Sequence, residues 1–98
     1  MRANKHKATA LRINTDGTTA IVKAKNGRDF SLEELQSFVG GYIEIIQLDD
    51  EYIMVVNEEG KLIGLPTNEN ATCMLAEIFG MVNYIVGDVI ICKSKFVK

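Results

Sequence analysis

Seven basic side chains gather in the first 28 residues, where the only carboxylate is Asp16. They are Arg2, Lys5, Lys7, Arg12, Lys23, Lys25 and Arg28. Ammonium and guanidinium groups make charge-assisted hydrogen bonds to phosphates and carboxylates, so a surface that collects several of them can hold an anion. The pattern therefore predicts an anion-binding surface to which Arg12, Lys23, Lys25 and Arg28 contribute.

The next stretch, residues 29–60, reverses the sign, because it contains nine carboxylates and neither Lys nor Arg. The formal net charge of −2 thus hides a separation of opposite charges along the chain. Such a protein can associate head to tail as a homo-oligomer, hold a small anionic ligand, or place its acidic face on a basic surface of a host protein, and the pattern leaves these open. The acidic candidates for a protein contact are Glu44, Asp49, Asp50, Glu51 and Glu58.

The polar residues do not assemble into a catalytic set. Glu44 lies inside an apolar run, where it is either a functional carboxylate or a side chain that points to solvent. No second acid or base is placed beside it. His6 falls in an expected N-terminal tail, and Ser31 is explained as a helix cap. We therefore expect a protein that binds without catalysing a reaction.

Composition and hydropathy argue against several other classes. The chain has one His, and the spacing of Cys73 and Cys92 matches no metal or redox motif, so we expect two buried free thiols and neither a metal nor a cofactor. The basic residues are confined to one hairpin and the termini, which disfavours nucleic acid as a partner. No apolar run reaches the ~18 residues of a membrane span, and no signal segment is recognised, which favours the cytoplasm.

Residues 57–68 lead from a short apolar stretch directly into a predicted helix start. Backbone N–H groups at a helix start are unpaired and suit a phosphate or carboxylate, which makes Leu65, Pro66 and Asn68 candidates for shaping a ligand pocket. The alternative is a strand that ends at Pro66, followed by an asparagine that only caps the helix. The sequence leaves both interpretations open.

The basic hairpin is predicted from two β-type segments, residues 9–14 and 18–24, on either side of Thr-Asp-Gly. Asp16 and Gly17 are typical of a tight two-residue turn. That turn would pair Ile13 with Ala20 and Leu11 with Val22 on a core face. Arg12 would then pair with Ile21 on the outer face.

Two short helices and further strands follow. Ser31 and Glu34 form a capping-box pattern that starts one helix, and Thr67, Asn68 or Asn70 can cap a second, whose apolar face runs from Ala71 to Phe79. Residues 42–48 and 52–57 predict a hairpin at the centre of the sheet. Residues 62–63 predict a short strand, and residues 82–93 predict one last strand or a pair interrupted at Gly87.

These elements define the fold class as α+β: an antiparallel sheet of five or six strands, open or curled into a partial barrel, with two short helices packed on it. The 98 residues fit a single domain spanning residues 1–98, with residues 1–7 as a mobile tail.

Four short motifs carry a resemblance to a known family. They are VGGYIE (residues 39–44), NEEGKL (57–62), GLPTN (64–68) and VGD (86–88). In this order they are similar to a family of small domains of unknown function common in bacteriophages and mobile elements. The resemblance implies a phage-type binding protein in the host cytoplasm, with no catalytic residue to transfer.

We accordingly expect an anti-defence protein that captures a small anionic, nucleotide-derived ligand, with Tyr42 or Tyr52 available to stack on a base. The alternative is an inhibitor that uses its acidic residues to occupy a basic surface of a host protein.

Overall fold

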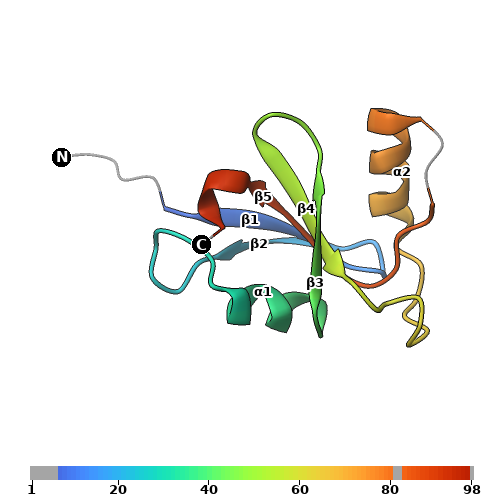
Figure 1. Cartoon of the computed structure of the whole chain (residues 1–98), viewed down its shortest axis with the longest axis horizontal. Helices are drawn as coiled ribbons and strands as arrows, with labels where there is room; N and C mark the ends of the chain where they lie inside the picture. Colours follow the sequence, from blue (N-terminus) through green and yellow to red (C-terminus); the bar gives the residue numbers. More distant parts are fainter. Residues whose placement is uncertain (1–6, 81–82, 98) are drawn as a thin grey trace.

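The computed structural model describes residues 7–80 and 83–97, and its α+β architecture confirms the predicted class (Figure 1). Five antiparallel strands form one open sheet in the order β2-β1-β5-β4-β3. The strands are β1 (Thr9–Ile13), β2 (Thr19–Lys23), β3 (Ile43–Gln47), β4 (Tyr52–Asn57) and β5 (Val89–Lys93). The helices are α1 (Leu32–Val39) and α2 (Glu69–Phe79), followed at the end by the 3-10 turn η1 (Ser94–Phe96).

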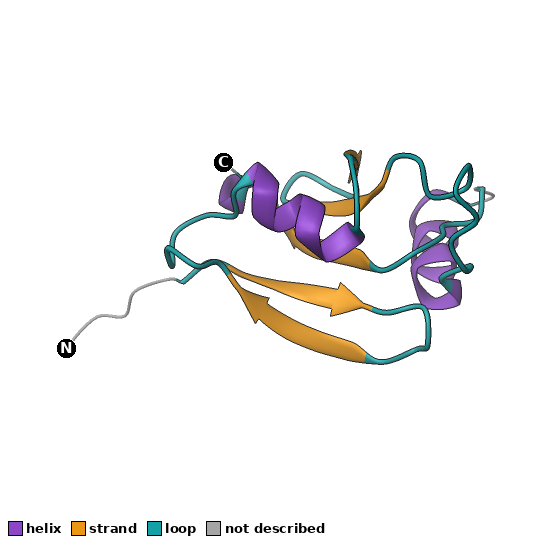
Figure 2. Ribbon diagram, turned by 90° about the horizontal axis from the view of Figure 1, so that it is seen from below, coloured by secondary structure: helices purple, strands orange, loops and turns teal. Residues whose placement is uncertain are grey.

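The sheet has an apolar core on each face, because successive side chains of a strand point to opposite sides. Ile53 and Val55 of β4 pack in one cluster with Leu35 of α1, whereas Met54 and Val56 pack in a second cluster that includes Leu75 of α2. Figure 2 shows α1 lying along the sheet and α2 standing at one end of it. The five-strand sheet is open, so β2 and β3 are both edge strands.

The predicted register of the first hairpin is wrong by one residue. Arg12 pairs with Ala20, and Leu11 pairs with Ile21. The cause is a three-residue loop: the Asn14 N–H donates to the Thr18 carbonyl at 2.9 Å, outside the expected two-residue turn. Gly17, with φ +92°, takes the left-handed position that closes such a loop.

This slip exchanges the faces of the two strands relative to one another. Ala10 and Val22 contact the α1 cluster, while Leu11 and Ile13 contact the α2 cluster. Arg12 does not pair with Ile21 on an outer surface. Its guanidinium instead pairs with Asp88, the residue just before β5.

The hairpin of β3 and β4 exists, but its predicted central place is wrong. Strand β5 occupies the centre and pairs with both β1 and β4, so β3 is left at the edge. The isoleucine run of β3 is accordingly only partly covered, with Ile45 46% exposed. Glu44 points to solvent on this edge strand.

Both helix starts are confirmed. Ser31 and Glu34 form the reciprocal capping box of α1, and the Asn68 side chain caps α2 by accepting from the Ala71 N–H. Gly40 and Gly80 end the two helices. In α2, the apolar face is buried only in part, since Ile78 and Phe79 are about half exposed.

Three smaller predictions change. Residues 62–63 form turns instead of a strand, with both side chains exposed. Cys92 is buried, and this burial raises the pKa of its thiol to about 11, but Cys73 on α2 is exposed. The last strand begins at Val89. Val82, His6 and most of the predicted tail lie outside the described residues.

No helix in the described part is long and apolar enough to cross a bilayer.

Candidate anion-binding site

The clearest concentration of charge is a basic depression beside the β2–α1 connection. Its volume is about 430 Å³. Three of the predicted ligand residues, Lys23, Lys25 and Arg28, line it together with Lys7. The remaining lining residues are Ala24, Asn26 and Gly27. We call the surface formed by these seven residues the basic depression.

Backbone hydrogen bonds fold the chain around this surface. The Ala8 N–H donates to the Gly27 carbonyl, and the Ala24 N–H donates to the Ala8 carbonyl, both at 3.0 Å. The Asn26 carboxamide oxygen accepts from the backbone N–H groups of Arg28 and Asp29. These contacts bring the segment before β1 alongside the turn after β2. Lys7 and Arg28 therefore line the same depression although they lie far apart in sequence.

Among the described residues, none of the four cations of the basic depression forms an ion pair. Two carboxylates flank the depression: Glu34 accepts from the Lys25 N–H, and Asp29 accepts from the Asn26 side-chain amide. The ion pairs among residues 7–80 and 83–97 join Arg12 to Asp88 and Lys93 to Glu51. None of the described lining residues carries a carboxylate. Four exposed positive charges around one concavity create an attractive potential for an anion and supply only hydrogen-bond donors at their tips. The arrangement can hold a phosphate or carboxylate group.

A second depression, of about 460 Å³, adjoins the first and shares Lys23 and Lys25 with it. Its other lining residues are Val22, Ser31, Glu33, Glu34, Ser37 and Phe38. We call it the α1 depression. Its wall combines apolar groups, hydroxyls and two carboxylates, so its chemistry differs from that of the basic depression.

Glu34 joins the two depressions. Its carboxylate accepts from the Ser31 N–H at 2.9 Å through Oε1 and from the Lys25 N–H at 2.8 Å through Oε2. These backbone hydrogen bonds, the one from Ser31 first, lower the pKa of Glu34 below its usual value. An ionised Glu34 therefore fixes the position of Lys25 relative to the first turn of α1.

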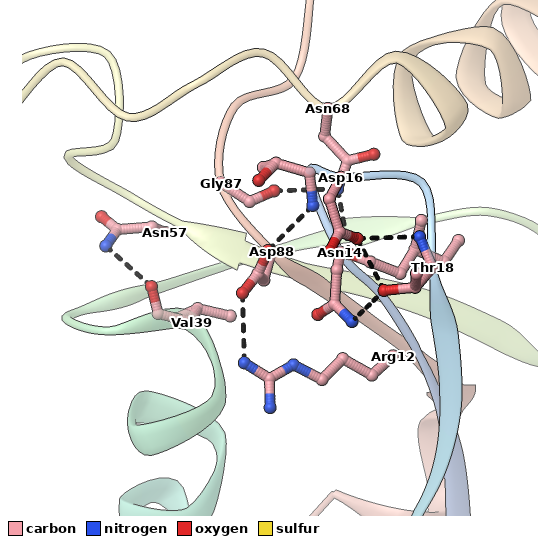
Figure 3. A network of polar contacts seen from close by, with 11 residues as sticks. Arg12, Asn14, Asp16, Thr18, Val39, Asn57, Asn68, Gly87 and Asp88 are labelled. Atoms are coloured by element: carbon pink, nitrogen blue, oxygen red, sulfur yellow. Dashed lines mark hydrogen bonds and ion pairs between the residues drawn. The ribbon is translucent and has the colours of Figure 1, made fainter.

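Arg12 lies outside the basic depression, contrary to its predicted grouping with the hairpin lysines. Its guanidinium donates from Nη2 to Asp88 Oδ2 at 3.1 Å, and Asp88 Oδ1 accepts from the Thr15 N–H at 2.9 Å (Figure 3). The Arg12 Nε is buried and has no hydrogen-bond partner among the residues that the structure describes. These contacts tie β1 and its turn to the start of β5, which gives Arg12 a structural role.

The predicted helix-start pocket is filled by the asparagine itself. Asn68 is fully buried, and its side-chain amide donates to the carbonyls of Ile13 and Gly87 at 3.0 and 2.9 Å (Figure 3). Its carbonyl oxygen accepts from the Ala71 N–H. Because every polar atom of the Asn68 side chain is engaged, the structure favours the purely structural interpretation of this cap.

The neighbouring loop lies apart from the basic depression. Leu65 is half buried and packs on Gly60 and Gly87, while Pro66 is exposed and its peptide bond is trans. Figure 1 shows this loop near α2, at the opposite end of the molecule from the turn at residues 24–28. Tyr42 is 63% exposed and lines neither of the two depressions. The predicted ligand residues therefore divide into separate regions.

The acidic candidates divide as well. Glu44 and Glu58 line a third concavity of about 330 Å³, together with Lys61, Leu62 and Tyr84. Its floor is apolar and includes Ile46, Val56, Leu75, Ile85 and Val86. The Lys61 ammonium lies 4.2 Å from the centre of the Tyr84 ring. We call this concavity the acidic-rimmed pocket.

The other three acidic candidates form the β3–β4 turn. Asp49 Oδ1 accepts from the Glu51 and Tyr52 N–H groups, and these hydrogen bonds lower its pKa. Glu51 lies 3.7 Å from Lys93, and Asp50 is exposed. Asp49 therefore stabilises the β3–β4 turn through its side chain.

Sequence reasoning missed Lys7, Glu33 and Phe38 as site residues. Lys7 falls in the segment expected to be a tail, and Glu33 and Phe38 follow Ser31, where the sequence predicts only a helix. The sequence feature that could have indicated Lys7 is the Asn26–Gly27 turn, because this turn returns the chain toward the start of β1. In the described part, no three His, Cys, Asp or Glu side chains converge as a metal site would require.

Fold and site together define a small α+β domain whose open sheet carries a basic depression at one end. The chain belongs to the family described as a domain of unknown function, DUF3846, whose model matches residues 8–96. This match confirms the expected membership of a family of domains of unknown function. No curated protein and no solved structure matches the chain.

Proposed function

We propose that the protein is a non-enzymatic binding protein that captures a small anionic ligand in the basic depression. The observation that carries this proposal is the convergence of Lys7, Lys23, Lys25 and Arg28 around one concavity, where none of them forms an ion pair with another described residue. Charge-assisted hydrogen bonds from such groups to a phosphate are among the stronger polar contacts that a protein surface makes. Each good contact of this kind contributes about 1.5–3 kcal/mol.

Capture without turnover agrees with the chemistry of the lining. Lys and Arg side chains at ordinary pH donate hydrogen bonds but do not accept a proton, so they bind an anion without providing a general base. Glu34, which accepts from the Lys25 N–H, is held by two backbone N–H groups, and these hydrogen bonds favour its ionised form. The site therefore has the features of a receptor for a stable anion.

The biological setting follows from the resemblance of the four motifs to phage and mobile-element domains. In that setting we propose an anti-defence role in the host cytoplasm, in which the protein sequesters a nucleotide-derived signal of bacterial immunity. Two open sheet edges, with Ile21 66% and Ile45 46% exposed, support the further proposal of a homo-oligomer.

The first test is native mass spectrometry of the purified protein, alone and with a pool of cyclic and linear nucleotides. A resolved mass increment would identify the ligand, and the same spectrum gives the oligomeric state. Titration calorimetry then compares Lys25→Glu with the matched control Lys61→Glu, which changes the same charge at the acidic-rimmed pocket. We expect about a tenfold or greater loss of affinity for Lys25→Glu, and no comparable loss for Lys61→Glu. Equal losses would contradict the assignment to the basic depression.

A second candidate function is supported by the acidic-rimmed pocket. Leu62 is 86% exposed and Tyr84 is 52% exposed beside Glu44 and Glu58. Exposed apolar residues with an acidic rim are features of a protein-interaction surface, here one suited to a basic surface of a host protein. Charge reversal separates the two candidates. Loss of activity in Glu44→Lys/Glu58→Lys, with full activity in Lys23→Glu/Arg28→Glu, would favour the inhibitor over the anion receptor.

A further inference from the structure

We infer that the α1 depression is a nucleoside subsite, so that the captured anion is a nucleoside phosphate with its phosphate in the basic depression and its nucleoside beside α1. This inference rests on the proposed function and extends it, because it assigns a place and recognition residues to the uncharged part of the ligand. The observations that carry it are the shared wall of the two depressions and the chemistry of the α1 depression.

The two depressions are continuous at Lys23 and Lys25, which line both. A ligand held by these ammonium groups at its phosphate can therefore extend into the α1 depression without leaving the protein surface. The volume of the α1 depression, about 460 Å³, falls in the range of concavities that hold small organic molecules. An inorganic anion would leave this second space unused.

The wall of the α1 depression suits a flat ring. Val22 and Phe38 are both partly buried, so each still presents apolar surface. The Phe38 ring is oriented by an edge-on contact with the buried Phe30, with centroids 6.1 Å apart and ring planes at 73°. A preset aromatic ring gives a base a surface on which to stack, and stacking of this kind contributes about 1–3 kcal/mol per base.

Hydrogen-bonding groups surround this apolar wall. The hydroxyls of Ser31 and Ser37 lie in the lining, and so does the carboxylate of Glu33. Unlike Glu34, Glu33 makes no ion pair or side-chain hydrogen bond among the described residues. A free carboxylate is an acceptor only, and a nucleoside offers matching donors in its ribose hydroxyls and its base N–H groups. This acceptor distinguishes a nucleoside phosphate from a purely apolar phosphate ester.

The contact between Glu34 and Lys25 makes the two subsites one unit. It fixes the loop that carries Lys25 to the helix that carries Glu33 and Phe38. A site assembled before binding loses less conformational entropy when the ligand arrives, which favours a ligand that spans both parts.

The experiment compares inorganic pyrophosphate with ADP and GDP by titration calorimetry on the full chain. Pyrophosphate tests the basic depression alone, and the nucleotides add the nucleoside. We expect nucleotides to bind about tenfold or more tightly than pyrophosphate, as stacking of one base predicts. Glu33→Gln and Phe38→Leu should each reduce this gain by at least about threefold. Phe38→Leu should leave pyrophosphate affinity unchanged, whereas Glu33→Gln removes a negative charge and should not lower it. The control Glu77→Gln, an exposed carboxylate on α2, should change neither affinity.

The outcomes separate this inference from the proposal on which it rests. If pyrophosphate binds and the nucleotides gain nothing, or the gain survives both variants, the nucleoside subsite is refuted while anion capture stands. If neither probe binds, both are refuted. Because Phe38 contributes to packing, thermal unfolding of Phe38→Leu checks that it is folded, and the exposed Glu33→Gln provides an independent result. A 2′-deoxynucleotide shows whether Glu33 reads the ribose or the base.

Discussion

The carboxylate of Glu34 accepts a hydrogen bond from the backbone N–H of Lys25 at 2.8 Å, which connects the first turn of α1 to the loop of the basic depression. The same carboxylate completes the capping box with Ser31. One side chain thus supports a helix start and positions a proposed ligand-binding residue. This dual role has consequences for affinity and for acid stability.

Replacing Glu34 with Ala is expected to lower anion affinity, although the substitution removes a negative charge and would raise affinity on electrostatic grounds alone. The reason is that Lys25 loses its backbone anchor. Calorimetry with pyrophosphate gives the sign of the change. The neighbouring variant Glu33→Ala removes an equal charge without the anchor, so a similar loss in both variants would argue against positioning by Glu34.

Acid should destabilise the protein through carboxylates whose pKa values are lowered in the folded state, among them Asp16, Glu34 and Asp49. A lowered folded-state pKa means that the stabilisation is present above the unfolded-state values of 4.5 for Glu and 3.8 for Asp. It is lost as pH falls through the lower folded-state values. Urea unfolding from pH 7 to pH 2 should show this decline, and Glu34→Gln should show a smaller decline. An unchanged pH profile in Glu34→Gln would contradict the role of this carboxylate.

Asn68→Ala is expected to destabilise the fold by about 3 kcal/mol, because it removes the α2 cap and leaves buried carbonyls of Ile13 and Gly87 unpaired. The exposed Asn70→Ala should cost less than about 0.5 kcal/mol. Chemical denaturation of both variants measures the difference. A comparable, small cost in both would mean that the buried amide contacts contribute little.

Gly87 and Gly64 share a left-handed backbone, with φ +79° and +76°, but differ in their surroundings. A Cβ on Gly87 would lie 2.8 Å from Leu65 Cδ1, whereas one on Gly64 meets nothing within 4 Å. Gly64→Ala should cost about 1–2 kcal/mol from backbone strain alone. Gly87→Ala should lower the free energy of unfolding further, because its Cβ also clashes with Leu65. Thermal unfolding of both variants tests this difference. In a Leu65→Ala background, which removes the clashing atom, Gly87→Ala and Gly64→Ala should cost about the same.

The two cysteines should react with a thiol reagent at very different rates. Cys73 is exposed, whereas Cys92 is buried with a pKa raised to about 11, which keeps its reactive thiolate scarce at neutral pH. A chromogenic disulfide reagent should therefore label one thiol per native chain quickly and the second only on unfolding. Cys73→Ser should remove the fast phase, and a fast phase that persists would place the reactive thiol at Cys92.

The sequence by itself determined the local elements of this protein. Ser31 and Glu34 predict the start of α1 because a capping box satisfies backbone groups within three residues. Thr67, Asn68 and Asn70 mark the start of α2 in the same way, although only the structure selects Asn68 as the cap. Apolar segments separated by turn residues predict the strands and the α+β class. The charge pattern also drew attention to Lys23, Lys25 and Arg28, which do lie together. Each of these inferences depends on neighbours along the chain.

Only the tertiary structure decided which distant residues meet. The central place of β5 depends on pairing with strands far away in sequence, and no local pattern encodes that choice. Arg12 pairs with Asp88 and so lies apart from the other basic residues. Lys7 lies beside them because backbone hydrogen bonds of Ala8 hold its segment against residues 24–27. A hairpin loop of three residues instead of two reversed the relative faces of β1 and β2. Long-range pairing and loop geometry depend on the free energy of the whole fold, so the shape of the site emerges only once the sheet is assembled.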